Sequence, residues 1–336
     1  MTTVPDPWPA GEWRRHLSGA IRDLDELLET LELDAERLDV EATLAHARRF
    51  PLRVPRGFVG RMRPGDPNDP LLRQVLPTIR EGDEAEGFTT DPVGELGLVG
   101  DDGTLSKYRG RALVVATGAC AVHCRYCFRR HFPYDGARSD HRRWESALAA
   151  VAADETVEEL ILSGGDPLML GDGALAALAA GVSEIPHLRR LRVHTRMPVV
   201  LPERVDEIFV DWIEALTLPV IVVIHANHPN EIDGDVRRAV AALRAAGATL
   251  LNQSVLLAGV NDDAGALAEL SKGLIDCGVL PYYLHLLDRV AGAAHFEVDE
   301  GRAVEIMSEL RQRLPGYLVP RLVREVQGAP SKVVIA

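Results

Sequence analysis

Residues 120–134, CAVHCRYCFRRHFPY, gather the side chains of this chain that are best suited to bind a metal. Three of its four cysteines, Cys120, Cys124 and Cys127, lie in this segment, and three arginines lie beside them. No secretory signal is visible at the start of the chain, so we expect a cytoplasmic protein. In a reducing cytosol, clustered cysteines are more often metal ligands or redox groups than disulfides.

Three kinds of site fit the C-x3-C-x2-C spacing. A structural zinc ion usually has four ligands, and His123 or His131 would have to supply the fourth. Three buried thiols on one helical face also fit, but that face would carry arginines inward. Three thiolates on a four-iron cube would leave one iron open for a non-protein ligand. The neighbouring arginines would then balance the negative charge of the sulfur ligands.

Composition indicates an ordinary soluble protein of the size of an enzyme. The 336 residues are 46% hydrophobic and 26% charged, and the formal net charge is −13. This negative charge argues against nucleic acid or an anionic membrane as the main partner. No apolar run approaches the roughly 18 residues that a membrane span needs.

Short apolar runs alternate with amphipathic helical patterns from residue 112 onward. Strands are predicted at 112–117, 159–163, 191–195, 220–225, 249–255 and 282–287. Such β-α units imply a parallel sheet with helical crossovers. We therefore expect an α/β fold, a partial (β/α)6 TIM-like barrel, with a doubly wound open sheet as the alternative. Polar residues follow the strands at their carboxyl ends, where such folds hold their active sites.

Three parts of the chain are predicted. Residues 1–106 start with helical periodicity, as in LDELLETLELDAERL, and continue into an irregular stretch rich in Pro, Gly and Asp. This stretch is too long for a plain loop, so we expect it to cover the barrel. Residues 107–315 form the barrel itself, and residues 316–336 form a C-terminal segment.

The cysteine spacing after the first strand, with SGGDPL after the second, resembles the radical S-adenosyl-L-methionine (SAM) enzymes. The stretches RMPVVLPERV, HANHPNEI, LNQSVLLAGVND and PYYLH are similar to the lysine 2,3-aminomutase family, and this resemblance covers most of the chain. It implies the radical SAM type of partial barrel and an isomerase. Such enzymes exchange an α-amino group with a hydrogen on the β-carbon.

The resemblance also implies three cofactors: a [4Fe-4S] cluster, SAM and pyridoxal 5′-phosphate (PLP). The cluster would be held by Cys120, Cys124 and Cys127. SAM would contact the glycine turn and two residues at strand ends, which are Gly164, Gly165, Asp166, His225 and Gln253. PLP would be held by Lys332, which position alone would make a surface lysine, and its phosphate by Lys107, Tyr108 and Arg111.

Substrate binding is implied at three residues. Arg129 matches the arginine that binds the substrate carboxylate in the family, and Asp288 and Glu325 match the two acids that bind the ε-ammonium of lysine. A charged amine in a cavity must be paired with carboxylates, so acidic residues at both positions favour lysine. Glu325 departs from the aspartate of the catabolic enzymes. Asp263 stands where those enzymes have a zinc-binding cysteine, so we predict no structural zinc.

The partners follow from the same resemblance. The run CRYCFRRHFPY and the short C-terminus most resemble the enzymes that make (R)-β-lysine for elongation factor P. This implies a functional link to that factor and its lysyl ligase, an external one-electron reductant and a homo-oligomer. Two rival hypotheses remain: a 2,3-aminomutase for glutamate or arginine, and a non-catalytic iron–sulfur or zinc-binding module.

Overall fold

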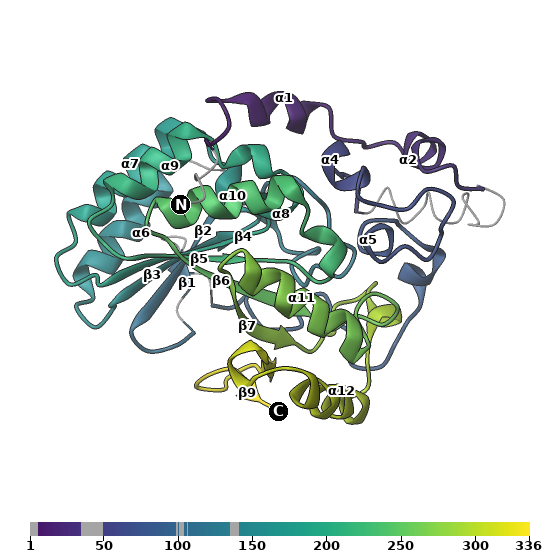
Figure 1. The fold of residues 1–336 in the computed structure, drawn as a ribbon. Coiled ribbons are helices and arrows are strands. Elements are labelled where there is room, and N and C mark those ends of the chain that lie inside the picture. Colours follow the sequence, from purple (N-terminus) through teal and green to yellow (C-terminus); the bar gives the residue numbers. More distant parts are fainter. Residues whose placement is uncertain (1–5, 35–49, 99, 101–103, 106, 135–140) are drawn as a thin grey trace.

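The computed structural model describes residues 6–34, 50–98, 100, 104–105, 107–134 and 141–336. A nine-stranded sheet lies at its centre, and the strands follow one another in chain order from β1 (Thr104–Leu105) to β9 (Val333–Val334) (Figure 1). β2 to β8 run parallel, whereas β1 and β9 pair antiparallel at the two edges. Because the strand order is linear, the sheet is open and forms a partial barrel.

Seven strands make up the parallel part of the sheet. They are β2 (Arg111–Thr117), β3 (Glu159–Gly164), β4 (Arg190–Thr195), β5 (Val220–Ile224), β6 (Thr249–Val255), β7 (Leu280–His285) and β8 (Arg321–Arg324). The first six confirm the predicted α/β fold of partial-barrel type. The predicted strand 282–287 was placed two residues too late, since Leu286 has already left β7 and donates its N–H to Val323. β8 was not predicted, because a four-residue strand carries too little alternation to recognise.

Helices cover the outer face of this sheet. The long crossover helices are α6 (His141–Ala153), α7 (Asp172–Ser183), α9 (Glu207–Ala215), α10 (Gly234–Ala245), α11 (Ala264–Asp276) and α12 (Glu300–Arg313). Shorter turns are η4 (Pro167–Met169), α8 (Met197–Val200), η5 (Pro202–Arg204), η6 (Pro229–Glu231), η7 (Ala294–Phe296) and η8 (Gly316–Leu318). Right-handed crossovers between consecutive parallel strands place successive helices on the same side. Within the described ranges, none of the helices has the length and apolar character needed to cross a membrane.

Aspartates fix where four of these helices begin. The side chains of Asp206, Asp233, Asp263 and Asp299 accept N–H groups of the first turns of α9, α10, α11 and α12. Each cap satisfies donors that the helix itself leaves free. Because the caps set the entry into each helix, they also set the length of the loops that follow β4 to β7.

Apolar residues of the strands and helices form the core. Leu162, Val193 and Val222 belong to one large buried cluster together with Leu178 of α7 and Phe209 of α9. A second cluster joins β7 and β8 to α11 and α12, through Leu284, Leu322, Leu267, Ile306 and Leu310. The C-terminal segment is therefore held to the sheet by burial of its own apolar residues.

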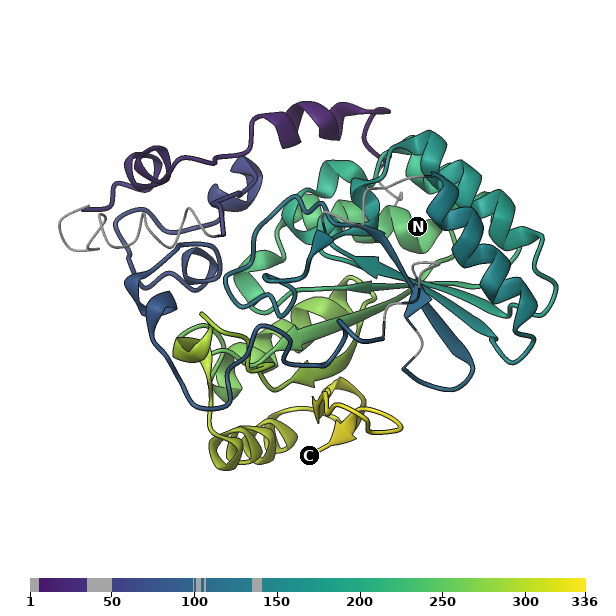
Figure 2. The same cartoon turned by 180° about the vertical axis from the view of Figure 1, so that it is seen from behind.

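The N-terminal part of the chain runs past the loops at the carboxyl ends of the strands. Its elements are α1 (Glu12–Ser18), α2 (Leu24–Thr30), α4 (Arg56–Val59), α5 (Pro70–Arg73) and η2 (Ile79–Gly82). Arg61 donates to the carbonyls of Val199 and Glu231, and Thr89 pairs with Val290. Seen from behind, α1 and α2 lie on the opposite side of the molecule from α12 and the C-terminus (Figure 2). The predicted continuation of the N-terminal helix beyond residue 34 lies outside the described residues.

Candidate active site

The three cysteines follow the carboxyl end of β2 as free, half-buried thiols. Burial raises the pKa of Cys120 well above its usual value, and the charges of Cys127, Asp166 and Cys124 add to this shift, which places the sulfurs close to one another. Burial and the charge of Cys124 likewise raise the pKa of Cys127 to about 11. Iron would have to displace these protons. Among the described residues, no three His, Cys, Asp or Glu side chains converge as a single ion requires.

The two histidines of the cysteine segment are both in contact with backbone carbonyl groups. His123 contacts the carbonyl of Pro51 through Nδ1 at 2.7 Å and stacks on Phe50. His131 contacts the carbonyl of Ala291 through Nε2 at 3.0 Å. These contacts place both rings against loops of the chain, which does not favour either of them as a fourth zinc ligand.

The arginines beside the cysteines are held by a carboxylate of the N-terminal part. Glu81 is buried, and its two oxygens accept hydrogen bonds from Arg125, with Arg130 adding a contact of 2.5 Å. Arg125 also donates to the carbonyl of Phe50 at 2.7 Å. Buried guanidinium groups need such partners, because an unpaired buried charge is strongly unfavourable. The cysteine segment is thus fixed against residues 50–82 through its arginines.

The glycine turn after β3 packs against the loop that leads into the cysteines. Gly164 has φ +115°, and a side chain on Gly165 would lie 2.4 Å from the Ala119 carbonyl oxygen. Only glycine fits this approach of two backbones. The Asp166 carboxylate accepts from Leu168 N, Thr195 Oγ1, Arg196 N and Met197 N, so both of its oxygens are used within the protein. We therefore regard Asp166 as fixing the turn and reserve the proposed SAM contact for the glycines.

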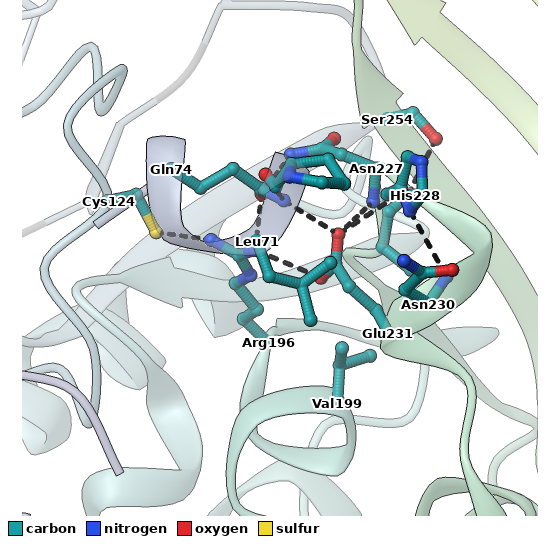
Figure 3. A network of polar contacts seen from close by, with 12 residues as sticks. Leu71, Gln74, Cys124, Arg196, Val199, Asn227, His228, Asn230, Glu231 and Ser254 are labelled. Carbon is teal, nitrogen blue, oxygen red and sulfur yellow. Dashed lines mark hydrogen bonds and ion pairs between the residues drawn. The ribbon is translucent and has the colours of Figure 1, made fainter. Parts of the chain in front are cut away.

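Polar residues from the ends of several strands meet in one buried network (Figure 3). Asn227, after β5, donates to Gln74 of the N-terminal part at 2.9 Å and accepts from Val255 N at 2.8 Å. Gln74 also donates to Glu231 at 3.1 Å. The sequence predicted polar residues at these strand ends, and the structure brings them together. Nothing in the sequence indicated that Gln74 would belong to this network.

Histidines point into the interior of the barrel. His225 and Gln253, predicted as cofactor contacts, lie with their Nε2 atoms 2.8 Å apart. Burial lowers the pKa of His225 to about 3 and that of His194 well below its usual value. Nε2 of His194 and Nε2 of His285 are buried and have no partner in the part of the chain that the structure describes. Such unpartnered ring nitrogens are suited to contact a bound cofactor.

Arg129 is tied to a second carboxylate of the N-terminal part, Glu95. Its Nε and Nη2 atoms lie 2.7 and 3.0 Å from the two Glu95 oxygens, and Nη1 donates to Ser163 Oγ and the Gly164 carbonyl. Lys107 Nζ lies 3.3 Å from the same carboxylate. Burial acts to raise the pKa of Glu95, but the charges of Arg129 and Lys107 outweigh it and lower that pKa. Glu95 therefore carries its charge and orients both cations.

Glu325 contacts three of the residues that were predicted to bind PLP. Tyr108 donates to it at 2.6 Å, Lys332 Nζ lies at 2.5 Å, and Lys107 Nζ lies at 3.5 Å. Burial acts to raise the pKa of Glu325, but these neighbours lower it to about 2. In contrast, burial raises the pKa of Asp288 to about 7, against the opposing charge of Lys332. The two acids that were predicted to bind an ammonium group thus have very different pKa values.

Arg111 faces a hollow of about 450 Å³ at the amino-terminal ends of the parallel strands. Arg109, Arg190 and Arg192 line the same hollow, together with two glutamates. The Arg111 guanidinium also lies 5.2 Å from the centre of the Tyr108 ring. Arg190 and Arg192 are paired with the two glutamates, Glu158 and Glu159, whereas Arg109 and Arg111 supply guanidinium groups of the kind that binds phosphate through paired N–H donors.

Fold and site together define a class of protein. Free cysteines spaced C-x3-C-x2-C follow the first parallel strand of a partial barrel, and a glycine turn on the next strand packs beside them. Residues 114–270 match the Radical SAM superfamily. The chain is therefore a radical SAM enzyme.

Three relatives narrow the class to a family. L-lysine 2,3-aminomutase of Escherichia coli is 50% identical over 321 residues, which are 96% of this chain and 93% of that protein. The enzyme of Haemophilus influenzae is 48% identical, covering 96% of this chain and 95% of that protein. That of Clostridium subterminale is 34% identical, covering 96% and 77%. The chain belongs to the lysine 2,3-aminomutase family, whose members are isomerases that use a [4Fe-4S] cluster, SAM and PLP.

The residues of this chain fit those three groups. Three free thiols are available to the cluster, and the buried ring nitrogens of His194 and His285, which have no partner among the described residues, would be available to SAM or PLP. Lys332 is the residue that would hold PLP, and the arginine-lined hollow beside Tyr108 would take its phosphate.

Two residues of the site, Glu95 and Arg196, were not predicted from the sequence. Glu95 lies in an irregular stretch with no periodicity, and Arg196 could be recognised only by its place after a strand.

We predict that Glu95→Gln weakens substrate binding. A neutral amide cannot hold two cations, so Arg129 would lose its fixed orientation. Loss of a charged hydrogen bond costs about 1.5–3 kcal/mol, which corresponds to a KM about ten- to a hundredfold higher. Steady-state kinetics measure this, with Glu86→Gln, an exposed residue of the same segment, as the control. A lower KM in Glu95→Gln would instead show that Glu95 competes with the substrate for Arg129.

Proposed function

We propose that this enzyme converts L-α-lysine to (R)-β-lysine. The observation that carries the proposal is the contact between the Lys332 ammonium and Glu325, at 2.5 Å. It shows that this carboxylate accepts an alkylammonium ion, which is the group at the end of a lysine side chain. Lys332 would leave this contact while its nitrogen holds PLP, and Glu325 would then be free to meet the ammonium group of an incoming substrate.

Charges at the site match those of lysine. Arg129 provides a buried cation for the α-carboxylate, held in place by Glu95. Glu325 and Asp288 provide the acidic partners for the ε-ammonium, and both lie within electrostatic range of Lys332. Since a buried charge requires an opposite charge, a substrate with one anionic and one cationic end suits this arrangement.

The chain's own residues bind and shield the reacting groups. When bound, the cluster and SAM supply a radical that removes a hydrogen atom, and PLP supplies an electron sink for the migrating amino group. We propose that residues 1–106 act as the cover of the barrel at 107–315, because Gln74, Glu81 and Glu95 all reach into the site. Such a cover excludes water from a reactive intermediate.

Glutamate and arginine are the rival substrates. The second carboxylate of glutamate would meet Glu325, whose low pKa keeps it charged, and repulsion disfavours this pairing. Arginine would offer a cation to the same acids, but its guanidinium is larger than the ammonium that Lys332 places there. The geometry therefore supports lysine over both rivals.

A substrate panel tests this proposal. Under anaerobic conditions with SAM, PLP and a reductant, we expect lysine to yield the β-amino isomer and glutamate and arginine to yield none. Chiral chromatography identifies the product. Lys332→Ala should abolish both product and the absorbance of bound PLP, while Lys272→Ala, an exposed lysine on α11, should retain both. Faster turnover of glutamate or arginine than of lysine would refute the assignment.

Substrate binding should depend on pH through Asp288. Its pKa of about 7 lies above the ordinary value for aspartate, so the folded protein retains this proton up to neutral pH and loses it as the pH rises further. The charged form pairs with an ammonium, so KM for lysine should fall about tenfold between pH 6 and pH 8. Asp288→Asn should bind lysine weakly and without this dependence. A KM profile that is the same in both proteins would contradict the role of Asp288.

We further propose a cytoplasmic enzyme whose product serves elongation factor P through the lysyl ligase of that factor. The run CRYCFRRHFPY supports this link. Deletion of the gene should remove β-lysine from the factor, and (R)-β-lysine added to the medium should restore it. Mass spectrometry of the purified factor measures the modification. A factor that stays modified in the deletion strain would exclude the link.

A further inference from the structure

Arg196 is a buried arginine that bonds directly to one of the cluster cysteines. It follows β4, is 6% exposed, and its Nη1 lies 2.7 Å from Cys124 Sγ (Figure 3). The arginines inside the cysteine segment are used differently, since Arg125 and Arg130 bind Glu81 and Arg129 binds Glu95. Among the described residues, Arg196 is thus the arginine whose guanidinium donates to a cysteine sulfur of the segment.

Several contacts hold the Arg196 guanidinium in this position. Its Nη2 donates to Gln74 Oε1 at 2.7 Å and to Glu231 Oε2 at 3.0 Å, and its backbone N donates to Asp166 at 2.7 Å. Gln74 in turn donates to the other oxygen of Glu231 at 3.1 Å. Each of these partners is buried, so the side chain has little freedom to move away from the sulfur.

The Arg196–Glu231 ion pair is oriented with its positive end toward Cys124. Its cation faces Cys124, and its carboxylate lies on the far side of the guanidinium, where Asn227 N and His228 N also donate to it. A neutral pair oriented in this way presents its positive end to the sulfur. Hydrogen bonds to sulfur and the charge around a cluster are the main means by which a protein sets its reduction potential.

We propose that Arg196 raises the reduction potential of the cluster by donating a hydrogen bond to the Cys124 sulfur, and that Glu231 moderates this effect. The reaction concerned is the uptake of one electron by the oxidised cluster from a low-potential one-electron donor. The donor is oxidised, the cluster is reduced, and no proton or bond moves with the electron. Reduction adds negative charge, so a fixed cation at the sulfur stabilises the reduced form more than the oxidised form. Arg196 is a positioning residue here, because it acts through Cys124.

Redox titration of the holoenzyme tests the proposal with two variants of opposite sign. SAM and amino acid are left out, and the signal of the reduced cluster is followed by electron paramagnetic resonance against the applied potential. Arg196→Gln should lower the ratio of reduced to oxidised cluster at the wild-type midpoint about tenfold, or about 59 mV for a one-electron couple. Glu231→Gln should shift the midpoint upward. Arg302→Gln, on the exposed face of α12, should leave it unchanged.

Iron and sulfide content decide how these results are read. An Arg196→Gln protein with full iron and sulfide and an unchanged midpoint would overturn the proposal. If Arg196→Gln does not retain the cluster, Glu231→Gln decides: an upward shift supports the proposal, and no shift or a downward shift overturns it. If neither variant retains the cluster, a purely structural role explains both, and the proposal fails. Because no amino acid is present, the outcome does not depend on whether lysine is the substrate.

Discussion

Carboxylates buried against arginines determine where the cysteine segment lies. Glu81 binds Arg125 and Arg130, and Glu95 binds Arg129, so each arginine of the segment is matched by an acid from the preceding hundred residues. Removing one partner of such a pair would leave a buried charge unpaired, which costs several kcal/mol, roughly 3–5. The cysteines therefore cannot move without the N-terminal part. The cysteine segment and the N-terminal part form one electrostatic unit.

The residues predicted to bind PLP and substrate continue this pairing of opposite charges. From Arg129 the contacts pass to Glu95, then to Lys107, Glu325 and Lys332, so that cations and anions alternate along the opening of the partial barrel. This arrangement pairs each of these five charged groups with a group of opposite charge. It also offers a cation, Arg129, and an anion, Glu325, to an amino acid that carries a carboxylate at one end and an ammonium group at the other.

The sequence predicted the features that depend on local patterns. Six strands and their helices could be placed from apolar periodicity, and the cysteines and Lys332 from their spacing and from resemblance to a family. β8 was missed because four residues give no period. Glu95 and Arg196 were missed for another reason: their partners are far away in sequence, 34 residues for Arg129 and 72 and 122 for Cys124 and Gln74. Pairings of this kind are determined by the topology of the sheet, and no local pattern marks them.

The position of the N-terminal part also has a consequence for biosynthesis. Gln74, Glu81 and Glu95 are synthesised before the arginines that they bind, and Thr89 and Lys107 are synthesised long before Val290 and Glu325. Many proteins fold from the N-terminus as they are made. Here Glu81 and Glu95 can meet their arginines early, whereas Thr89 reaches Val290 only after most of the barrel has been synthesised. The cysteine segment therefore acquires its final surroundings in two stages, first from Glu81 and Glu95 and later from the last strands of the sheet.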